Sequence, residues 1–470
     1  MKVEQIYTGC IAHAAYYLES NGEAAIFDPL REVQPYMDRA VADRATIKYV
    51  FETHFHADFV SGHLDLAKKT GAKIVYGPTA KPGFDAIVAE DNQVFEVGAY
   101  KVKVIHTPGH TMESTTYLLI DENGKEHGII TGDTLFIGDV GRPDLAQHVI
   151  AELTEEKLAN HLFDSLRNKI MPLADDLIVY PNHGAGSACG KKMSKETTDT
   201  LGHQKQTNYA LRTDMTREEF VKELLTGLTT PPAYFPKNVL MNIQGYDSLD
   251  TILERGNKAL IPKSFEVVAE VTHALILDTR APEVFAKGFI PNAINIGLDG
   301  NFAMWVGELI PDIKQQILLV TDQGREEEAI IRLSRVGYDY AIGYLEGGFE
   351  AWKNEGREID QVERLSALEL EQLSPSNPLI IDIRKKSEYD SEHLISAVNL
   401  PLNELNTRFL ELPTDKPFIM HCGGGYRSMI AASILKSRGY HNFKDVEGGM
   451  DAIAKTSMPK TEYVCPTTLL

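Results

Sequence analysis

The sequence lacks the long apolar segments that a membrane protein needs. None of its hydrophobic runs approaches the ~18 residues that span a bilayer as a helix, which excludes an ordinary integral membrane protein. It has only 4 cysteines among 470 residues, too few for a disulfide scaffold in a chain of this length. Glu4 and Gln5 stand where an export signal would need its apolar stretch, so we expect a cytoplasmic location.

Positive charge is also scarce. Lysine and arginine contribute 47 side chains against 67 aspartates and glutamates, which gives a formal net charge of −20. A field of that sign repels nucleic acids and anionic membrane surfaces, so we expect neither as a partner. Small anionic substrates are not excluded, because a local pocket can be positive inside an acidic surface. The hydrophobic share of 43% and the charged share of 24% are typical of a soluble globular protein, and the length suggests about three domains.

Runs of β-branched and aromatic residues in the first 210 residues are each followed by a histidine or an aspartate. Such runs predict strands, here at 47–53, 101–107, 127–133 and 176–182. Residues 215–228 then predict a helix that opens with a capping box of Thr216 and Glu219. The proline-rich residues 231–246 that follow predict an aperiodic connector packed against another part of the chain.

The second half of the chain contains an internal repeat. Residues 275–296 resemble residues 379–400, with Asp278 matching Asp382. The spacing of roughly a hundred residues indicates a duplicated domain, since solenoid units repeat every ~20–50 residues. Each copy alternates strands and helices, which predicts a parallel sheet covered by helices on both faces. The hydrophilic residues 354–366 separate the copies.

Histidines and aspartates at the ends of predicted strands make a candidate metal site. His54 and His56 flank one residue, so a turn at the strand's end can aim both into one cleft. Other groups follow in the same turn or after later strands: Asp58, His110, Asp133 and His183. A single histidine would be explained more readily as a core or surface residue. Imidazoles and carboxylates that repeat the same placement are instead what a divalent transition metal requires.

These residues resemble those of the metallo-β-lactamase superfamily, with its H-x-H-x-D motif and its later histidine, aspartate and histidine. The resemblance covers residues 1 to about 210 and implies a four-layer αββα sandwich with the metal at one edge of two sheets. Dinuclear zinc hydrolases of the superfamily carry a metal-binding histidine directly after the motif's aspartate. This chain has Phe59 there, which cannot ligate, so we expect a single-metal centre.

Within the superfamily, the chain resembles the persulfide dioxygenases, which hold one iron with two histidines and one aspartate. By motif position these ligands are His54, His110 and Asp133, and they imply one Fe(II) per chain, although the purified protein could carry zinc. Such a triad leaves positions open for O₂ and substrate. The other motif residues then orient ligands or water by hydrogen bonds, or they bind a second, weaker metal: His56, Asp58 and His183.

Two further residues could support this site. Arg142 lies in a G-D-V-G-R-P-D run that also resembles the persulfide dioxygenases, and it could pair with a buried carboxylate and stiffen the loop that carries Asp133. Cys189 follows His183 on a loop of small residues that could approach the metal. It is either a thiol that accepts or shields sulfane sulfur near the metal, or a small buried side chain where little room exists.

A second candidate site lies in the second repeat, where an apolar strand at 417–420 leads to H-C-G-G-G-Y-R-S and then to a helix. A cysteine between a strand and a helix N-terminus faces backbone N–H groups, which favour the thiolate. Arg427 adds a positive charge for an incoming anion. The loop around Cys422 comprises Gly423, Gly424, Gly425, Tyr426 and Ser428, and its glycines let the backbone curl close to the sulfur.

This loop resembles that of the rhodanese family, with Cys422 as the nucleophile that carries a persulfide. Counted from Cys422 to Arg427, the loop has six residues. Related phosphatases use one residue more, so the length favours sulfur transfer. The first repeat has Asp322 at the matching place, and an aspartate cannot carry sulfane sulfur. We therefore expect the first copy to be catalytically inactive.

The whole chain is expected to be an α/β multidomain protein, a metallo-β-lactamase sandwich followed by two rhodanese-like parallel-sheet domains. Its domain order resembles that of the bifunctional persulfide dioxygenase–sulfurtransferases. That resemblance implies O₂-dependent oxidation of a thiol persulfide (of glutathione, coenzyme A or a similar thiol) to sulfite, sulfur exchange between sulfite and thiosulfate, and a homo-oligomer. We expect a dioxygenase domain at 1–235 and a connector at 236–264. An inactive rhodanese domain at 265–360 and an active one at 361–470 are expected to follow.

Two other functions remain open from the sequence. One is a zinc-dependent thioester hydrolase of the glyoxalase II type fused to a sulfurtransferase, against which Phe59 speaks. The other is a persulfide sensor or sulfur carrier that uses Cys422 only to bind. A carrier has no need of the three metal ligands.

Overall fold

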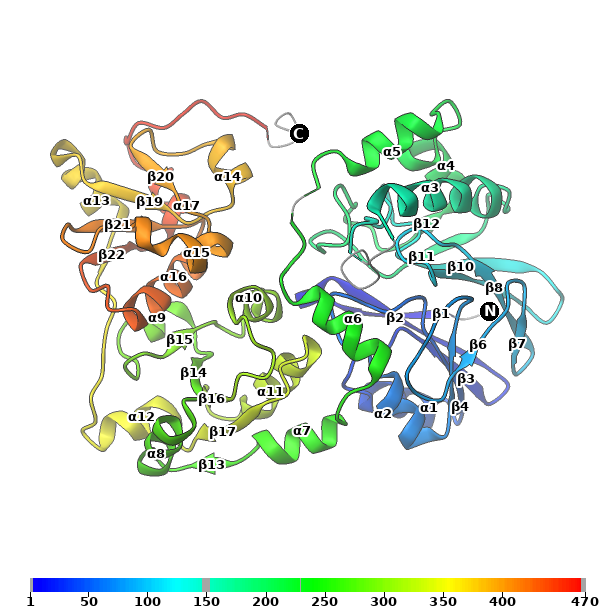
Figure 1. Cartoon of the computed structure of the whole chain (residues 1–470), viewed down its shortest axis with the longest axis horizontal. Coiled ribbons are helices and arrows are strands. Elements are labelled where there is room, and N and C mark those ends of the chain that lie inside the picture. Colours follow the sequence, from blue (N-terminus) through cyan, green and yellow to red (C-terminus); the bar gives the residue numbers. More distant parts are fainter. Residues whose placement is uncertain (1–2, 146–152, 229, 466–470) are drawn as a thin grey trace. The chain divides into compact units, whose positions relative to one another are not determined.

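The computed structural model describes residues 3–145, 153–228 and 230–465. The chain forms two compact units, one of Met1–Thr251 with Leu333–Tyr338 and the other of Ile252–Arg332 with Asp339–Leu470 (Figure 1). No helix among the described residues combines the length and the apolar character that crossing a membrane would require. The domain boundaries expected from the sequence stay predictions.

Two six-stranded sheets form the frame of the first unit. One sheet follows the chain order: β1 (Val3–Thr8), β2 (His13–Ser20), β3 (Glu23–Phe27), β4 (Thr46–Phe51), β5 (Lys73–Tyr76) and β6 (Ile87–Val88). The other reverses it: β12 (Asp199–Thr200), β11 (Ile178–Pro181), β10 (Glu126–Gly132), β9 (Thr115–Ile120), β8 (Tyr100–His106) and β7 (Val94–Val97). The four runs predicted to be strands coincide with β4, β8, β10 and β11, which confirms them.

The sheets pack face to face over an apolar core. Aromatic rings from both sheets meet there, with the Phe27 and Phe51 centroids 4.9 Å apart and the Phe51 and Tyr117 centroids 5.0 Å apart. Helices α1 (Gln34–Ala42) and α2 (His63–Thr70) cover the outer face of the first sheet. Helices α3 (Glu155–Ser165) and α5 (Arg217–Leu225) cover the second, with α4 (Leu201–Thr207) beside them. The predicted four-layer αββα sandwich is confirmed.

Residues 231–246, expected to be an aperiodic connector, instead contain helix α6 (Phe235–Gln244). Pro236 lies in its first turn, where the missing N–H of proline is no loss, so the proline starts the helix. The Asn242 side chain donates to the carbonyls of His56 and Phe59, at 2.8 Å each, and accepts from the Ser61 amide at 3.0 Å. Helix α6 is therefore a support for the loop that carries the H-x-H-x-D motif.

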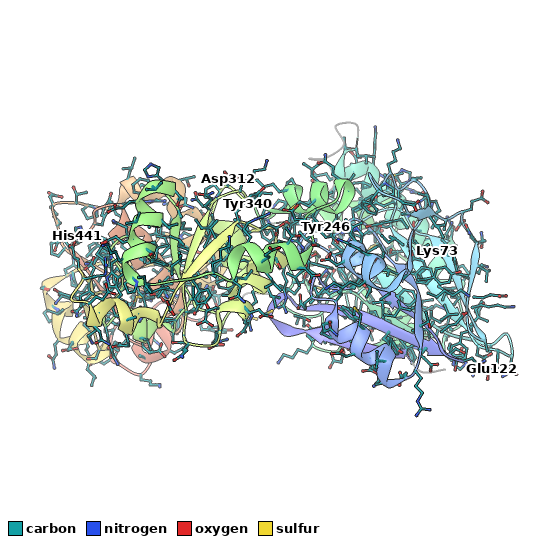
Figure 2. The ribbon with its side chains drawn as sticks, turned by 90° about the horizontal axis from the view of Figure 1, so that it is seen from below. Lys73, Glu122, Tyr246, Asp312, Tyr340 and His441 are labelled. Atoms are coloured by element: carbon teal, nitrogen blue, oxygen red, sulfur yellow. The ribbon has the colours of Figure 1, made fainter. Side chains whose placement is uncertain are left out.

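The motif loop is held from two other places in the same unit. The Val60 amide donates to the Arg335 carbonyl at 2.7 Å, so residues of the first repeat close this side of the loop. Tyr246, labelled in Figure 2, follows α6 and donates through its hydroxyl to the Ser61 carbonyl. It precedes helix α7 (Leu249–Gly256). The loop is thus fixed by hydrogen bonds from segments far away in the sequence.

The second unit contains two five-stranded sheets, and every strand pair in both is parallel. The first has the order β13 (Ala259–Leu260), β17 (Ala341–Leu345), β16 (Ile317–Val320), β14 (Leu275–Asp278) and β15 (Ile294–Asn295). The second has β18 (Arg364–Leu365), β22 (Phe443–Val446), β21 (Phe418–His421), β19 (Leu379–Asp382) and β20 (Ala397–Asn399). The orders correspond strand for strand, so the predicted repeat and its parallel sheets are confirmed.

Helices complete both copies of the repeat. The first copy has α8 (Pro262–Thr272), α9 (Pro282–Phe285), α10 (Phe302–Leu309), α11 (Glu326–Arg335) and α12 (Gly348–Asn354). The second has α13 (Ala367–Leu373), α14 (Lys386–Ser391), α15 (Leu405–Arg408), α16 (Tyr426–Ser437) and α17 (Gly449–Ile453).

The repeat extends to single hydrogen bonds. Arg280 pairs with Asp278 in the first copy (Nη2–Oδ2 2.5 Å), and Arg384 pairs with Asp382 in the second (2.6 Å). All four side chains are buried. In each copy one asparagine of the neighbouring strand donates to the carbonyls of both partners. The same ion pair therefore fixes the end of β14 in the first copy and the end of β19 in the second.

Replacing Arg384 with methionine leaves the Asp382 carboxylate buried without its partner, and we expect a loss of ~3–5 kcal/mol in the stability of the second copy. Lys386→Met is the matched control, because its pair with Asp390 is solvent-exposed and such pairs contribute ~0–1 kcal/mol. Hydrogen exchange of the β19 and β21 amides measures both losses. Equal protection in the two variants would contradict the role of the pair.

Candidate metal centre and thiol loop

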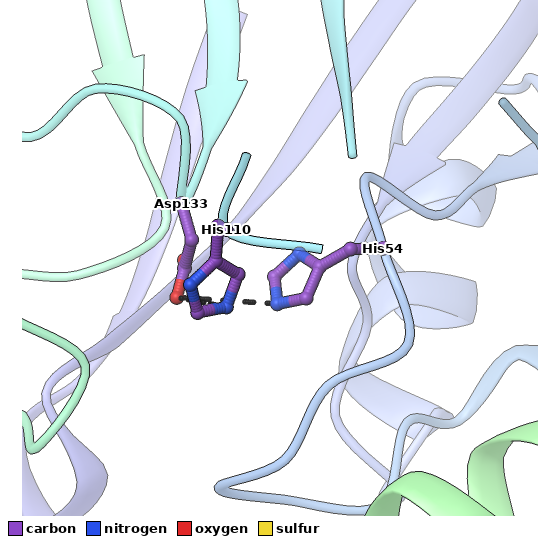
Figure 3. Close-up of side chains that lie close together, drawn as sticks. All are labelled: His54, His110 and Asp133. Atoms are coloured by element: carbon purple, nitrogen blue, oxygen red, sulfur yellow. Dashed lines mark ion pairs between the residues drawn. The ribbon is translucent and has the colours of Figure 1, made fainter. Parts of the chain in front are cut away.

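Three predicted ligands converge where strands of the two sheets end. His54 follows β4, His110 follows β8 and Asp133 follows β10 (Figure 3). Asp133 Oδ2 lies 3.4 Å from His110 Nε2 and 3.9 Å from His54 Nε2. One ligand atom from each residue lies within 4.8 Å of the others, and all three side chains are buried. We call these three residues the primary group.

The donor atoms of the primary group are turned toward one another. His110 Nδ1 donates to the Arg142 carbonyl at 2.7 Å, which fixes the tautomer and leaves Nε2 with a lone pair for a metal. Burial, followed by the neighbouring imidazoles, holds the pKa of His54 well below its usual value, so this ring is neutral. Among the described residues, neither oxygen of Asp133 has a hydrogen-bond partner. A buried, unpaired carboxylate is costly, and a bound cation would offset that cost.

The loop beside the primary group requires glycine at position 141. The Gly141 amide donates to the Asp133 carbonyl at 3.0 Å. A Cβ at this position would lie 2.1 Å from that carbonyl oxygen and 2.9 Å from His110 Nδ1. The backbone can therefore approach two candidate ligands only because no side chain intervenes.

Arg142 braces the same loop. Its guanidinium donates to both carboxylate oxygens of Asp144, at 2.6 and 2.5 Å, and both side chains are buried. Its amide donates to the Cys189 carbonyl at 2.9 Å. Such a two-point pair is rigid, so it fixes the carbonyl that orients His110.

His56 belongs to a separate buried cluster with Asp28 and Glu52. Its Nε2 lies 3.0 Å from Asp28 Oδ1 and 3.5 Å from Glu52 Oε2. Burial alone would lower the pKa of His56, but the two carboxylates raise it well above its usual value. Burial also raises the pKa of Glu52 to about 7. Neither Asp28 nor Glu52 was predicted from the sequence as part of a site. The one local signal for them is that each directly follows a strand rich in apolar residues.

Asp58, His183 and Cys189 form a third group, which we call the secondary group. His183 Nε2 lies 3.5 Å from Asp58 Oδ2 and 3.5 Å from Asp133 Oδ1. The ligand atoms of the three residues lie within 4.8 Å of one another. Burial, and then the charges of Asp58 and Asp133, raise the pKa of the Cys189 thiol well above its usual value. Cys189 thus lies beside the candidate metal centre.

Phe59 directly follows Asp58, the last residue of the H-x-H-x-D motif. Its ring is fully buried between two histidines, with centroids 4.3 Å from His13 and 4.3 Å from His56. No donor atom enters the site from this residue. His13, which was not predicted from the sequence, donates through Nε2 to the Asp28 carbonyl at 2.8 Å, and its ring packs against Phe59.

The thiol loop, residues 422–427, follows β21 and ends in α16. The Gly425 amide points at Cys422 Sγ at 3.1 Å, and Gly425 has a left-handed φ of 105° that favours glycine. The Met450 amide donates to the Cys422 carbonyl at 2.7 Å. Gly449 makes that approach feasible, because its Cβ would lie 2.5 Å from the same carbonyl oxygen. The sulfur therefore lies at a helix N-terminus, where the backbone favours an anion.

The other loop residues have distinct contacts. Arg427 makes two hydrogen bonds to Glu388, at 2.5 and 2.8 Å, a partner that the sequence did not indicate. The Tyr426 hydroxyl donates to the Gly297 carbonyl of the first copy at 2.7 Å. Ser428 is buried and donates to the Gly425 carbonyl at 3.3 Å.

In the first copy, Arg325 pairs with Asp299 and Glu328 near Asp322.

Models of two known protein families match the chain, one in its first part and one twice in its second part. A model of the metallo-beta-lactamase superfamily matches residues 8–161, and a model of the rhodanese-like domain matches residues 265–355 and 366–456. A metallo-beta-lactamase structure from Staphylococcus aureus is 32% identical, covers 73% of this chain and 98% of that chain, and has a TM-score of 0.64. The chain belongs to the metallo-beta-lactamase superfamily.

Two curated relatives each match less than half of this metallo-beta-lactamase family member. A probable hydroxyacylglutathione hydrolase of Schizosaccharomyces pombe is 27% identical over 42% of this chain and 74% of that protein. A hydroxyacylglutathione hydrolase of Brucella anthropi is 37% identical over 29% of this chain and 48% of its own length. The chain therefore spans about half the length of the second relative. The superfamily fold binds metal ions, and the primary group supplies suitable ligands for one.

Gly141→Ala should displace the loop that orients His110 and Asp133, because its Cβ has no room. We expect the purified variant to retain at most about a tenth of the wild-type metal, in line with the 10–100-fold affinity losses that follow when ligand-orienting groups are removed. Metal analysis of the two proteins measures this. Gly9→Ala is the control, since nothing lies within 4 Å of a Cβ there. Full metal retention by Gly141→Ala would contradict the assignment.

Proposed function

We propose that the first unit is a non-haem Fe(II) persulfide dioxygenase and that Cys422 carries out rhodanese sulfur transfer. The donor set of the primary group, two imidazoles and one carboxylate, supports the iron assignment, because such triads suit Fe(II) oxygenases. A bound ferrous ion would supply the redox chemistry that joins O₂ to the outer sulfur of a thiol persulfide. His54, His110 and Asp133 would hold it from one side.

Sulfite contains three oxygen atoms, so the reaction balances when O₂ supplies two of them and water supplies the third. One thiol persulfide, one O₂ and one water give one thiol and one sulfurous acid, which ionises to sulfite. The outer sulfur is oxidised, O₂ is reduced, and the S–S bond breaks to release the thiol with a proton. The chain's own residues would exclude bulk water, because all three ligands and Phe59 are buried. A site that admits the one reacting water but keeps out bulk solvent protects reactive intermediates from side reactions.

Cys422 would take part in a separate transfer. In its persulfide form, the outer sulfur is attacked by sulfite, a new S–S bond gives thiosulfate, and the Cys422–sulfur bond breaks to leave a thiolate. The Gly425 N–H and the α16 N-terminus would stabilise that thiolate. Arg427 would attract the anion, with Glu388 fixing its orientation. Running the steps backwards loads Cys422 from thiosulfate.

A second candidate is a zinc-dependent hydrolase of glutathione thioesters, in the same first unit. The names of the curated relatives favour it. Phe59 weighs against it, because the ring removes a ligand from the dinuclear arrangement that we expect for such hydrolases. Both candidates use a small thiol, for which glutathione and coenzyme A are proposed, and a homo-oligomer stays a prediction.

Oxygen uptake separates the two candidates. Iron-loaded protein should consume one O₂ per glutathione persulfide and form one sulfite, while hydroxyacylglutathione is left intact. His110→Ala and Asp133→Asn should reduce uptake to background, because each removes one of three ligands. His203→Ala, an exposed histidine of α4, is the control and should keep full activity. Thioester hydrolysis without O₂ uptake would overturn the dioxygenase proposal.

Cys422→Ser should abolish thiosulfate formation and leave sulfite formation from persulfide within about twofold of wild type, because a serine hydroxyl cannot carry sulfane sulfur. Cys465→Ser, which changes an exposed cysteine, should leave both unchanged. Chromatography of sulfite and thiosulfate measures both products. Loss of both in Cys422→Ser would show that the two centres depend on each other.

A further inference from the structure

Tyr426, the first residue of α16, reaches from the second copy of the repeat into the first. Its hydroxyl donates to the Gly297 carbonyl at 2.7 Å, and burial raises the pKa of this hydroxyl above its usual value, so it stays protonated and able to donate. A Cβ at Gly297 would lie 3.3 Å from Tyr426 Cε2, and a Cβ at Gly300 would lie 2.7 Å from the same atom. The ring therefore fits only against glycine. We call residues 297–300 the glycine slot.

The glycine slot is braced by side chains of the first copy. Arg332 Nη1 donates to the Leu298 carbonyl at 2.6 Å. Arg325 donates to both carboxylate oxygens of Asp299, at 2.8 and 2.9 Å. Arg325 belongs to the loop after Asp322, which stands where the second copy has its thiol loop. The loop without a cysteine thus helps to hold the slot that receives the tyrosine.

Helix α16 is buried on every side. Its residues 428–435 are all buried, and a run of that length makes about two turns. A helix at the surface of a domain normally leaves one face in water. Here α9 and β15 of the first copy lie against that face (Figure 1), and the Asn295 amide donates to the buried Ser433 Oγ at 2.9 Å. Both copies therefore position the helix whose N-terminus faces the Cys422 sulfur.

Tyr426 lies between the two groups that the thiol loop offers to an anion. Gly425, the residue before it, points its N–H at Cys422 Sγ at 3.1 Å, and Arg427, the residue after it, carries the guanidinium. A shift of the tyrosine would move the N–H, because the two residues share one peptide bond. The guanidinium has a further anchor in its pair with Glu388. Loss of the slot should therefore disturb the N–H geometry at the sulfur more than the attraction of an anion.

We propose that Tyr426 is a positioning residue for sulfur transfer and that the glycine slot of the first copy is the partner it requires. The copy without the cysteine then takes part in the reaction, because it fixes the backbone N–H groups at the N-terminus of α16 around the sulfur. This inference rests on the proposed sulfur transfer by Cys422, and it is independent of the metal centre.

Steady-state kinetics of the full-length protein test the proposal, with thiosulfate as sulfur donor and cyanide as acceptor. The Cys422 thiolate takes the outer sulfur of thiosulfate, sulfite leaves, and cyanide removes the sulfur as thiocyanate. Gly300→Val fills the slot and Tyr426→Ala removes the ring. Each should lower kcat about tenfold, since a misplacement of ~1 Å can cost up to ~100-fold. KM for thiosulfate should stay within about twofold, because Glu388 still holds Arg427. The double variant should be no slower than Tyr426→Ala.

Two measurements separate positioning from folding. Mass spectrometry of the persulfide on Cys422 counts the competent sites, and kcat is expressed per competent site. A purely structural role would lower that count and leave the rate at each site unchanged. Tyr463→Ala is the matched control, because it removes an exposed tyrosine of the same copy, and it should keep the wild-type kcat and KM.

An unchanged kcat per site in Gly300→Val overturns the proposal, and so do effects of the two substitutions that multiply in the double variant. A raised KM with unchanged kcat also overturns it, because Tyr426 would then be a contact for the substrate. A wild-type protein that transfers no sulfur from thiosulfate to cyanide refutes the proposed function of Cys422 itself. The two failures are therefore distinguished by the wild type alone.

Discussion

The candidate metal centre of the first unit depends on one buried carboxylate, that of Asp133. Asp133 is buried at the end of β10 with three imidazole nitrogens within 4 Å and no hydrogen-bond donor for its carboxylate among the described residues. Burying a carboxylate in this way is unfavourable unless a positive partner is supplied. The rest of the unit is arranged to keep the carboxylate there. Two sheets bring strand ends together, and glycine at 141 lets a loop close over them.

The metal centre is supported from distant parts of the chain. Asn242 of α6 and the Arg335 carbonyl of the first repeat both hold the motif loop between β4 and α2. Arg142 and Asp144 fix the carbonyl that orients His110. Since small displacements of ligands weaken metal binding, such supports matter as much as the ligands themselves. A role for the first repeat follows, because it contributes to the first unit without carrying a thiol of its own.

The two copies of the repeat separate scaffold from chemistry. Each keeps one buried ion pair at a strand end, Asp278–Arg280 at β14 and Asp382–Arg384 at β19. Only the second copy has the glycine-rich loop that brings backbone N–H groups to a sulfur. In the first copy Asp322 stands at that place. Asp322 is exposed, whereas Cys422 is buried against the backbone of Gly449 and Met450.

The sequence by itself determined the local features. Alternation and β-branched runs located β4, β8, β10 and β11, the capping box located α5, and internal similarity revealed the duplicated sheets. Motif position and family resemblance predicted that His54, His110 and Asp133 meet, while the tertiary structure alone decided the other polar pairings. His56 pairs with Asp28 and Glu52, Arg427 pairs with Glu388, and Cys189 lies against Asp58 and His183. Local patterns depend on neighbours along the chain and can be recognised from sequence. Contacts between distant residues depend on how sheets and loops pack, and no spacing in the sequence encodes them.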